Sequence, residues 1–220
     1  MNRRMLVIGA SGLAAAIFAG GTIYTRNRQR IEQEKVAAET PAVSDDFLVR
    51  SYSPVLGDAE APVTLVEFFD PSCEACRAFH PLVKELLSKH AGKLKVVVRY
   101  AAFHKGSDEA VRILETARMQ QKFEPVLEAL LEKQPAWAAH GKPDLALAWK
   151  IAGSAGLDLE RAKSDRLFPG IIAILNQDAQ DVNTAGVRQT PTFFLNGKIV
   201  EIKSRESLSL AVKGAIGIAG

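Results

Sequence analysis

Two apolar runs in the middle of the chain have the pattern of buried β-strands. Residues 63–69 and 94–100 are nearly continuous stretches of β-branched and aromatic side chains, which is typical of strands covered on both faces. Between them, residues 76–89 carry apolar side chains at helical spacing, with Pro81 expected to kink the helix and Gly92 to end it. This order predicts a βαβ unit with parallel strands and a right-handed crossover.

Helical spacing dominates a long block that follows. Residues 107–186 repeat apolar positions with glycine and proline interruptions, so we expect several helices there. Strand character returns at residues 192–195, and Asn196–Gly197 is a strong hairpin signal before a partner strand over 198–203. Residues 204–216 then predict a closing helix with a serine cap. The pattern indicates an α/β fold in which a helical insertion separates two halves of one sheet.

The start of the chain differs from the rest. Residues 5–24 form a run of 20 residues without a charge, and a helix of that length spans about 30 Å, the thickness of a bilayer core. Three interpretations stay open: an uncleaved signal anchor, a signal peptide cleaved near residues 19–21, and a buried core helix. Arginines flank the run on both sides, so charge does not set its orientation.

A polar segment separates this run from the globular pattern. Residues 25–46 are polar and contain Pro41, which favours a solvated tether. A short charged helix over residues 26–40 that joins copies of the chain is the alternative. The predicted domains are a signal anchor or signal peptide over 1–24, a tether over 25–46 and a globular domain over 47–220, with its helical insertion at about 105–186.

Composition and charge exclude several classes of protein. The chain is 47% hydrophobic, which argues against disorder. Its 28 basic and 25 acidic residues leave a net charge of +3, and no basic stripe is interleaved with aromatic residues, so we expect no nucleic acid partner. There are two cysteines, which excludes a disulfide-stapled mini-protein and a four-cysteine zinc site.

Both cysteines belong to one C-x-x-C motif, formed by Cys73 and Cys76. The motif falls where a predicted strand ends and a helix begins, and the positive end of a helix favours a thiolate. Cys73 is therefore the expected nucleophile and Cys76 the resolving thiol of a pair that exchanges disulfides. A metal site that adds His80 and a purely structural disulfide are the alternatives.

Three further positions fit this chemistry. Glu67, in the first buried strand, is a candidate proton acceptor for Cys76, unless it is a surface charge at the strand edge. Arg99 is a candidate partner of Glu67, with an ordinary surface arginine as the alternative. Thr190–Pro191 precedes the hairpin, and a cis bond there would present the backbone of residue 190 to an extended client.

The motif VEFFDPSCEAC at residues 66–76 and the motif TPTFFLNG at residues 190–197 resemble those of the thioredoxin superfamily, most closely its exported DsbA-like branch. The resemblance covers about residue 51 to the C-terminus, and residues 54–57 are similar to the family's first strand. It implies a thioredoxin fold with an inserted helical domain, preceded here by an N-terminal transmembrane or signal helix. It implies in turn these site residues: Cys73 as nucleophile, Cys76 as resolving thiol, Pro191 as the cis-proline facing them, and Glu67 as the family's buried acid.

One departure from the family concerns the two residues between the cysteines. The strongly oxidising members carry Pro-His, whereas this chain has Glu74 and Ala75. A histidine cation stabilises the thiolate of the reduced form, and Glu74 would do the opposite if it faced the sulfur. We therefore expect a more ordinary reduction potential, which leaves open the direction of electron flow.

The favoured function is an exported protein thiol–disulfide oxidoreductase with no cofactor and no metal. Client proteins with cysteine thiols or disulfides are expected to contact Thr190, Glu74 and Ala75. The candidates for an apolar rim are Phe69, Pro71, Phe103 and Phe193, of which some are expected to lie in the core instead. The alternatives are a reductase or isomerase of the same fold and, from another class, a protein that binds copper(I) through both thiolates.

Location and partners follow from the oxidising chemistry, because stable disulfide exchange suits the periplasm rather than the cytosol. We expect a bacterial inner-membrane protein with its catalytic domain in the periplasm, or a soluble periplasmic protein if the first segment is cleaved. The expected partners are clients, a DsbB-like or DsbD-like membrane redox protein, and the membrane itself through the N-terminal helix.

Overall fold

The computed structural model describes residue 28 and residues 45–219. The chain divides into two units, residues 1–42 and 43–220. Within the described part, no helix combines the length and the apolar character needed to cross a bilayer. The apolar run at residues 5–24, and the tether apart from Arg28 and the two residues 45 and 46, lie outside the described residues.

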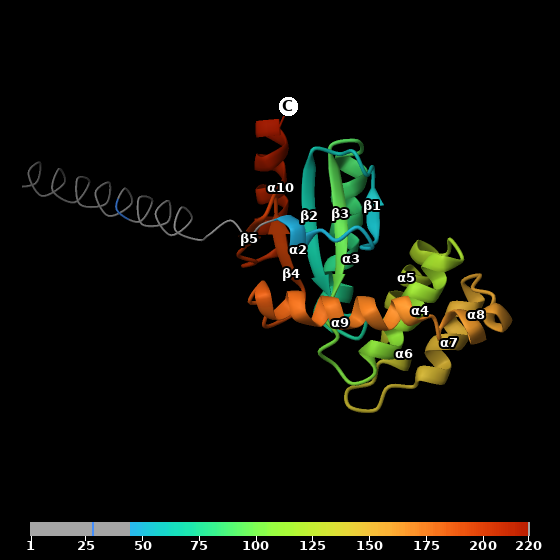
Figure 1. Ribbon diagram of the computed structural model, residues 1–220. Helices are drawn as coiled ribbons and strands as arrows, with labels where there is room; N and C mark the ends of the chain where they lie inside the picture. Colours follow the sequence, from blue (N-terminus) through green and yellow to red (C-terminus); the bar gives the residue numbers. More distant parts are fainter. Residues whose placement is uncertain (1–27, 29–44, 220) are drawn as a thin grey trace, which may run out of the picture. The chain divides into compact units, whose positions relative to one another are not determined.

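A mixed five-stranded sheet forms the centre of the globular unit (Figure 1). Its strand order is β1-β3-β2-β4-β5, and β2 and β3 run parallel whereas the other neighbours are antiparallel. This confirms the predicted βαβ unit and the final hairpin, although β5 ends three residues earlier than predicted. The strands are β1 Val55–Gly57, β2 Val63–Phe69, β3 Leu94–Tyr100, β4 Thr192–Leu195 and β5 Lys198–Val200.

The helices lie where the sequence pattern predicted them, but their first and last residues differ from the predicted ones. One long helix connects β2 to β3 and continues through Pro81. Six helices lie between β3 and β4, and a last helix closes the chain. The short helix α2, which begins within the segment predicted as a tether and precedes β1, was not predicted. The helices are α2 Asp45–Leu48, α3 Glu74–Lys89, α4 Ser107–Met119, α5 Phe123–Glu132, α6 Gln134–Trp137, α7 Leu145–Ser154, α8 Leu159–Asp165, α9 Pro169–Thr184 and α10 Arg205–Ala219.

Two apolar clusters cover the two faces of the sheet. Alternate residues of β2, such as Leu65 and Phe69, belong to the larger cluster, which includes buried side chains of α3, α4, α5 and α10. The intervening residues Val66 and Phe68 belong to the smaller cluster, together with Val182 of α9. Both faces are therefore covered, which explains why the sequence of β2 is apolar throughout rather than alternating.

The predicted pairing of Arg99 with Glu67 is wrong. In the parallel register Glu67 lies opposite Val98, while Arg99 lies opposite Phe68, on the other face of the sheet. Arg99 is fully buried there and forms 2.7 Å ion pairs with Asp178 and with Asp181 of α9. Because successive residues of a strand point to opposite faces, Arg99 joins β3 to α9 and leaves Glu67 on the α3 face.

The end of the sheet toward which β2 and β3 run is the end that carries the two cysteines. β2 ends at Phe69 and β3 ends at Tyr100. The amide of Ala101, the first residue after β3, donates a 2.9 Å hydrogen bond to the carbonyl oxygen of Phe69. Figure 1 shows the inserted helices gathered at this same end. Parallel strands bring residues that follow them together at one edge, and that edge is the candidate site.

Candidate active site

Cys73 occupies the N-cap position of α3. Its side chain is 6% exposed, and the pKa of its thiol is lowered to about 5. A hydrogen bond from the Cys76 thiol is the largest cause and outweighs burial, with the Thr190 side chain and the amides of Ala75 and Cys76 acting in the same direction. At neutral pH Cys73 is therefore a thiolate at the positive end of a helix.

Cys76 lies one turn into α3 and is fully buried. Burial raises the pKa of its thiol well above the ordinary value, and its hydrogen bond to Cys73 and the negative charge of Glu67 act in the same direction. Cys76 therefore keeps its proton while Cys73 loses its own. The two thiols therefore differ in charge and exposure, and the predicted roles of nucleophile and resolving thiol stay predictions.

Glu67 lies in the middle of β2 and is 4% exposed. Burial, followed by the negative charge of Cys73, raises the pKa of its carboxyl to about 8. The prediction of a buried acid rather than a surface charge agrees with this position. The negative charge of Glu67 is one of the causes that raise the pKa of Cys76.

Thr190 and Pro191 close the site on the β4 side. The peptide bond between them is cis, and the carbonyl oxygen of Thr190 lies 3.2 Å from Sγ of Cys73. Glu74 and Ala75, between the cysteines, are exposed. The structure thus brings Cys73, Cys76, Glu67 and Thr190 together. Their roles stay predictions at this point.

Of the four candidates for an apolar rim, three belong to the buried interior, as was expected for some of them. Phe69 and Phe193 are buried because they belong to the larger apolar cluster. Pro71, in the loop before Cys73, is buried as well. Phe103, in the loop between β3 and α4, is 47% exposed. It is the one member of that set that a client can contact.

The sequence interpretation missed Asp70, which follows β2 and is fully buried. Its Oδ1 accepts hydrogen bonds from the amide of Ser72 at 2.8 Å and from the hydroxyl of Ser107. Its Oδ2 accepts from the amide of Phe103 at 2.8 Å and from the amide and Nδ1 of His104 at 3.0 and 2.7 Å. Asp70 therefore joins the loop before Cys73 to the loop after β3. Aspartate bonding the amide two residues ahead is a recognised turn pattern, so this role had a signal in the sequence.

Gln134 is a second residue that the sequence interpretation missed. It begins α6, and its buried amide Nε2 donates to the carbonyl oxygens of Pro71 and Cys73 at 2.8 and 3.0 Å. The helical insertion thereby holds the backbone on both sides of Ser72. No local pattern around Gln134 signals this contact, because it depends on tertiary packing.

His80 does not join the cysteines. Its Nε2 lies 2.9 Å from Oε1 of Glu128 on α5. In the described part of the chain, no group of three or more histidine, cysteine, aspartate or glutamate side chains is arranged to hold a metal ion. The structure therefore offers no support for the alternative metal site with His80.

The fold and this geometry define the class of thioredoxin-fold proteins with paired cysteines at the start of a helix. Residues 50–214 match the family described as thioredoxin, and the chain belongs to that family. A putative protein-disulfide oxidoreductase of Rickettsia typhi is 28% identical over 195 residues, which cover 86% of this chain and 70% of that protein.

Solved structures give the same assignment. A thioredoxin-like oxidoreductase from Silicibacter pomeroyi is 29% identical with a TM-score of 0.67, and the match covers 79% of this chain and 97% of the other. Alpha-DsbA1 of Wolbachia pipientis shares the fold at 21% identity with a TM-score of 0.65, and the match covers 78% of this chain and 94% of the other. The structural neighbours are thus DsbA-like, in agreement with the resemblance seen in the sequence.

Some curated relatives are much longer than this chain. A Na(+)/H(+) antiporter NhaA of Herminiimonas arsenicoxydans is 28% identical over 189 residues. These residues cover 84% of this chain and 29% of the antiporter. The chain therefore matches less than a third of that protein.

Proposed function

We propose that the protein is a thiol–disulfide oxidoreductase that passes the disulfide of Cys73 and Cys76 to cysteine thiols of client proteins. The observation that carries this proposal is the contrast between the two thiols. The pKa of Cys73 is lowered to about 5, whereas that of the buried Cys76 is raised. A thiol that leaves easily, next to one that is protected, is the arrangement that disulfide exchange requires.

The proposed reaction proceeds through a mixed disulfide. A client thiolate attacks Sγ of Cys73, the Cys73–Cys76 bond breaks, and its electron pair goes to Cys76. Glu67, protonated at neutral pH because its pKa is raised to about 8, supplies a proton to Cys76. The second client thiolate then attacks the client sulfur, which forms the client disulfide and releases Cys73 as a stable thiolate. The protein has gained two electrons, and the client has lost them.

Client backbone is proposed to lie beside Thr190, whose carbonyl is already next to Sγ of Cys73. An extended segment that pairs with this backbone gains affinity that is independent of sequence. Exposed Glu74, Ala75 and Phe103 supply the side-chain contacts around it. Broad client range is the expected property of such a surface.

The reduction potential of the cysteine pair tests this function and its direction. A thiol pKa of about 5 lies between the values of roughly 7 for thioredoxin and 3.5 for DsbA. Their potentials are about −270 and −120 mV, so we expect a value of about −180 mV in glutathione buffers for residues 45–220. A value near about −250 mV would favour the reductase alternative, and the absence of a transition would overturn the proposal.

The proposed location is outside the cytoplasm. Disulfide donation is favoured in an oxidising compartment, and the uncharged run at residues 5–24 is long enough for a signal anchor or signal peptide. Under this proposal residues 25–46 tether the domain of residues 47–220, and a DsbB-like or DsbD-like membrane protein renews the pair. Labelling of Cys73 in intact cells with a membrane-impermeant maleimide tests it, and labelling only after lysis would contradict it.

A further inference from the structure

The loop between β3 and α4 places a histidine at the edge of the cysteine site. Nδ1 of His104 donates to Oδ2 of Asp70 at 2.7 Å, and the amide of His104 donates to the same oxygen at 3.0 Å. Asp70 is fully buried, whereas the His104 side chain is 32% exposed. Because both its ring and its backbone are held, His104 is fixed relative to the loop that leads from Asp70 to Cys73.

The anchor of this histidine is connected directly to the nucleophile. The amide of Cys73 donates to the carbonyl oxygen of Asp70 at 3.1 Å, which closes the turn between β2 and α3. The carboxylate of Asp70 thus holds His104 while its backbone holds Cys73. Asp70 therefore connects His104 to the start of α3.

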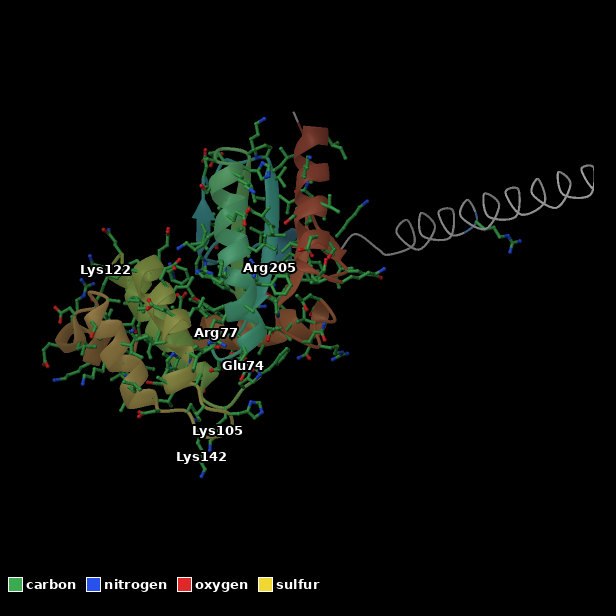
Figure 2. All side chains as sticks on the ribbon, turned by 180° about the vertical axis from the view of Figure 1, so that it is seen from behind. Glu74, Arg77, Lys105, Lys122, Lys142 and Arg205 are labelled. Atoms are coloured by element: carbon green, nitrogen blue, oxygen red, sulfur yellow. The ribbon has the colours of Figure 1, made fainter. Side chains whose placement is uncertain are left out.

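The charges around His104 favour its protonated form. Burial lowers its pKa, but the bond to Asp70 and the negative charges of Asp70, Cys73 and Glu74 outweigh burial and raise the pKa overall. The ring of His140 lies 6.3 Å away edge-on. Lys105 follows in the chain and donates to the carbonyl of Gly141 at 3.3 Å, and Figure 2 shows Lys105 and Lys142 on the same side of the molecule as Glu74.

We propose that His104 is a positioning residue that stabilises the Cys73 thiolate by its positive charge, with Asp70 holding the imidazolium in place. The inference rests on the proposed function, because it concerns the charge of the same thiolate. The cation that the C-x-x-C motif lacks comes from the loop after the neighbouring parallel strand.

The interaction between His104 and Cys73 can be measured in the wild-type protein, because each charge must affect the pKa of the other group. If the thiolate favours protonation of His104, protonated His104 favours the thiolate by the same free energy. When Cys73 and Cys76 form a disulfide, Cys73 carries no charge and this contribution disappears. The pKa of His104 must therefore be lower in the oxidised protein than in the reduced protein.

The experiment titrates His104 by NMR in oxidised and reduced protein, and titrates Cys73 by its thiolate absorbance in the wild type, H104Q and the control H140Q. We expect H104Q to raise the pKa of Cys73 by about one unit, a tenfold loss of thiolate relative to thiol, and H140Q to leave it unchanged. Equal His104 pKa values in the two redox states, or an unchanged Cys73 pKa in H104Q, would overturn the inference. Neither outcome touches the proposed function, which fails only if wild-type protein does not exchange disulfides.

Discussion

Replacing Cys73 by serine is expected to abolish disulfide transfer, whereas replacing Cys76 by serine is expected to stop the reaction halfway. Without Cys73 the remaining thiol is fully buried, and its pKa is raised, so it neither attacks nor is attacked. With Cys76 replaced, Cys73 still has its thiolate but has no internal partner to release the client. The C76S protein should therefore accumulate a mixed disulfide with one client cysteine.

The two variants serve as controls for each other, because each removes one buried thiol from the same turn of α3. Non-reducing mass spectrometry after incubation with a disulfide-containing peptide gives the result. We expect one peptide bound per C76S chain and none bound to C73S. The reverse pattern, or equal capture by both variants, would contradict the assignment of Cys73 as the nucleophile.

Replacing Glu67 by glutamine is expected to slow exchange on the order of 100-fold, the lower range for loss of a general acid or base. Glutamine keeps the shape of the side chain but neither donates nor accepts the proton that Cys76 needs. Stopped-flow measurement of mixed-disulfide formation, in which the Cys73–Cys76 bond breaks and Cys76 takes up its proton, isolates the affected step. The matched control is E115Q, which removes another buried carboxyl, bonded to Tyr100 and Arg118 rather than to the cysteines. An equal loss in both variants would show that Glu67 acts only through stability.

E67Q is also expected to change how the free energy of unfolding depends on pH, and the raised pKa of Glu67 determines the sign of that change. In the reduced protein the pKa of Glu67 is about 8 against 4.5 ordinarily, so between these values the folded state holds more protons than the unfolded state. The free energy of unfolding therefore falls as pH rises through this window. E67Q lacks that loss, and at pH 7 it should be more stable than wild type by up to about 3 kcal/mol. Urea unfolding at pH 5 and pH 7 measures the difference.

The sequence predicted the parts of the site that depend on local pattern. The β-branched run before Cys73 located β2, the helical spacing after it located α3, and the turn at Asn196–Gly197 located the final hairpin. Each of these depends on a few neighbouring residues, so its signal is contained in the chain itself. The C-x-x-C motif and its position at a helix start then gave the chemistry.

The sequence could not predict contacts that depend on register and long-range packing. Arg99 was paired with Glu67 because both lie in buried strands, yet a difference of one residue in register places Arg99 on the opposite face. Gln134 and His104 reach the site from α6 and from the loop after β3, 61 and 34 residues from their respective partners Cys73 and Asp70. The sequence also could not tell which candidates for the apolar rim are exposed. An apolar residue type does not show whether another element of the fold covers the side chain.

Direct transfer of the disulfide tests the central claim of this account. Oxidised wild-type protein is mixed with an equal amount of a reduced peptide that contains two cysteines, quenched with acid and weighed by mass spectrometry. We predict that the peptide loses two hydrogen atoms and forms its own disulfide, while Cys73 and Cys76 become thiols in equal amount. A peptide that stays reduced beside an intact Cys73–Cys76 disulfide would contradict the account.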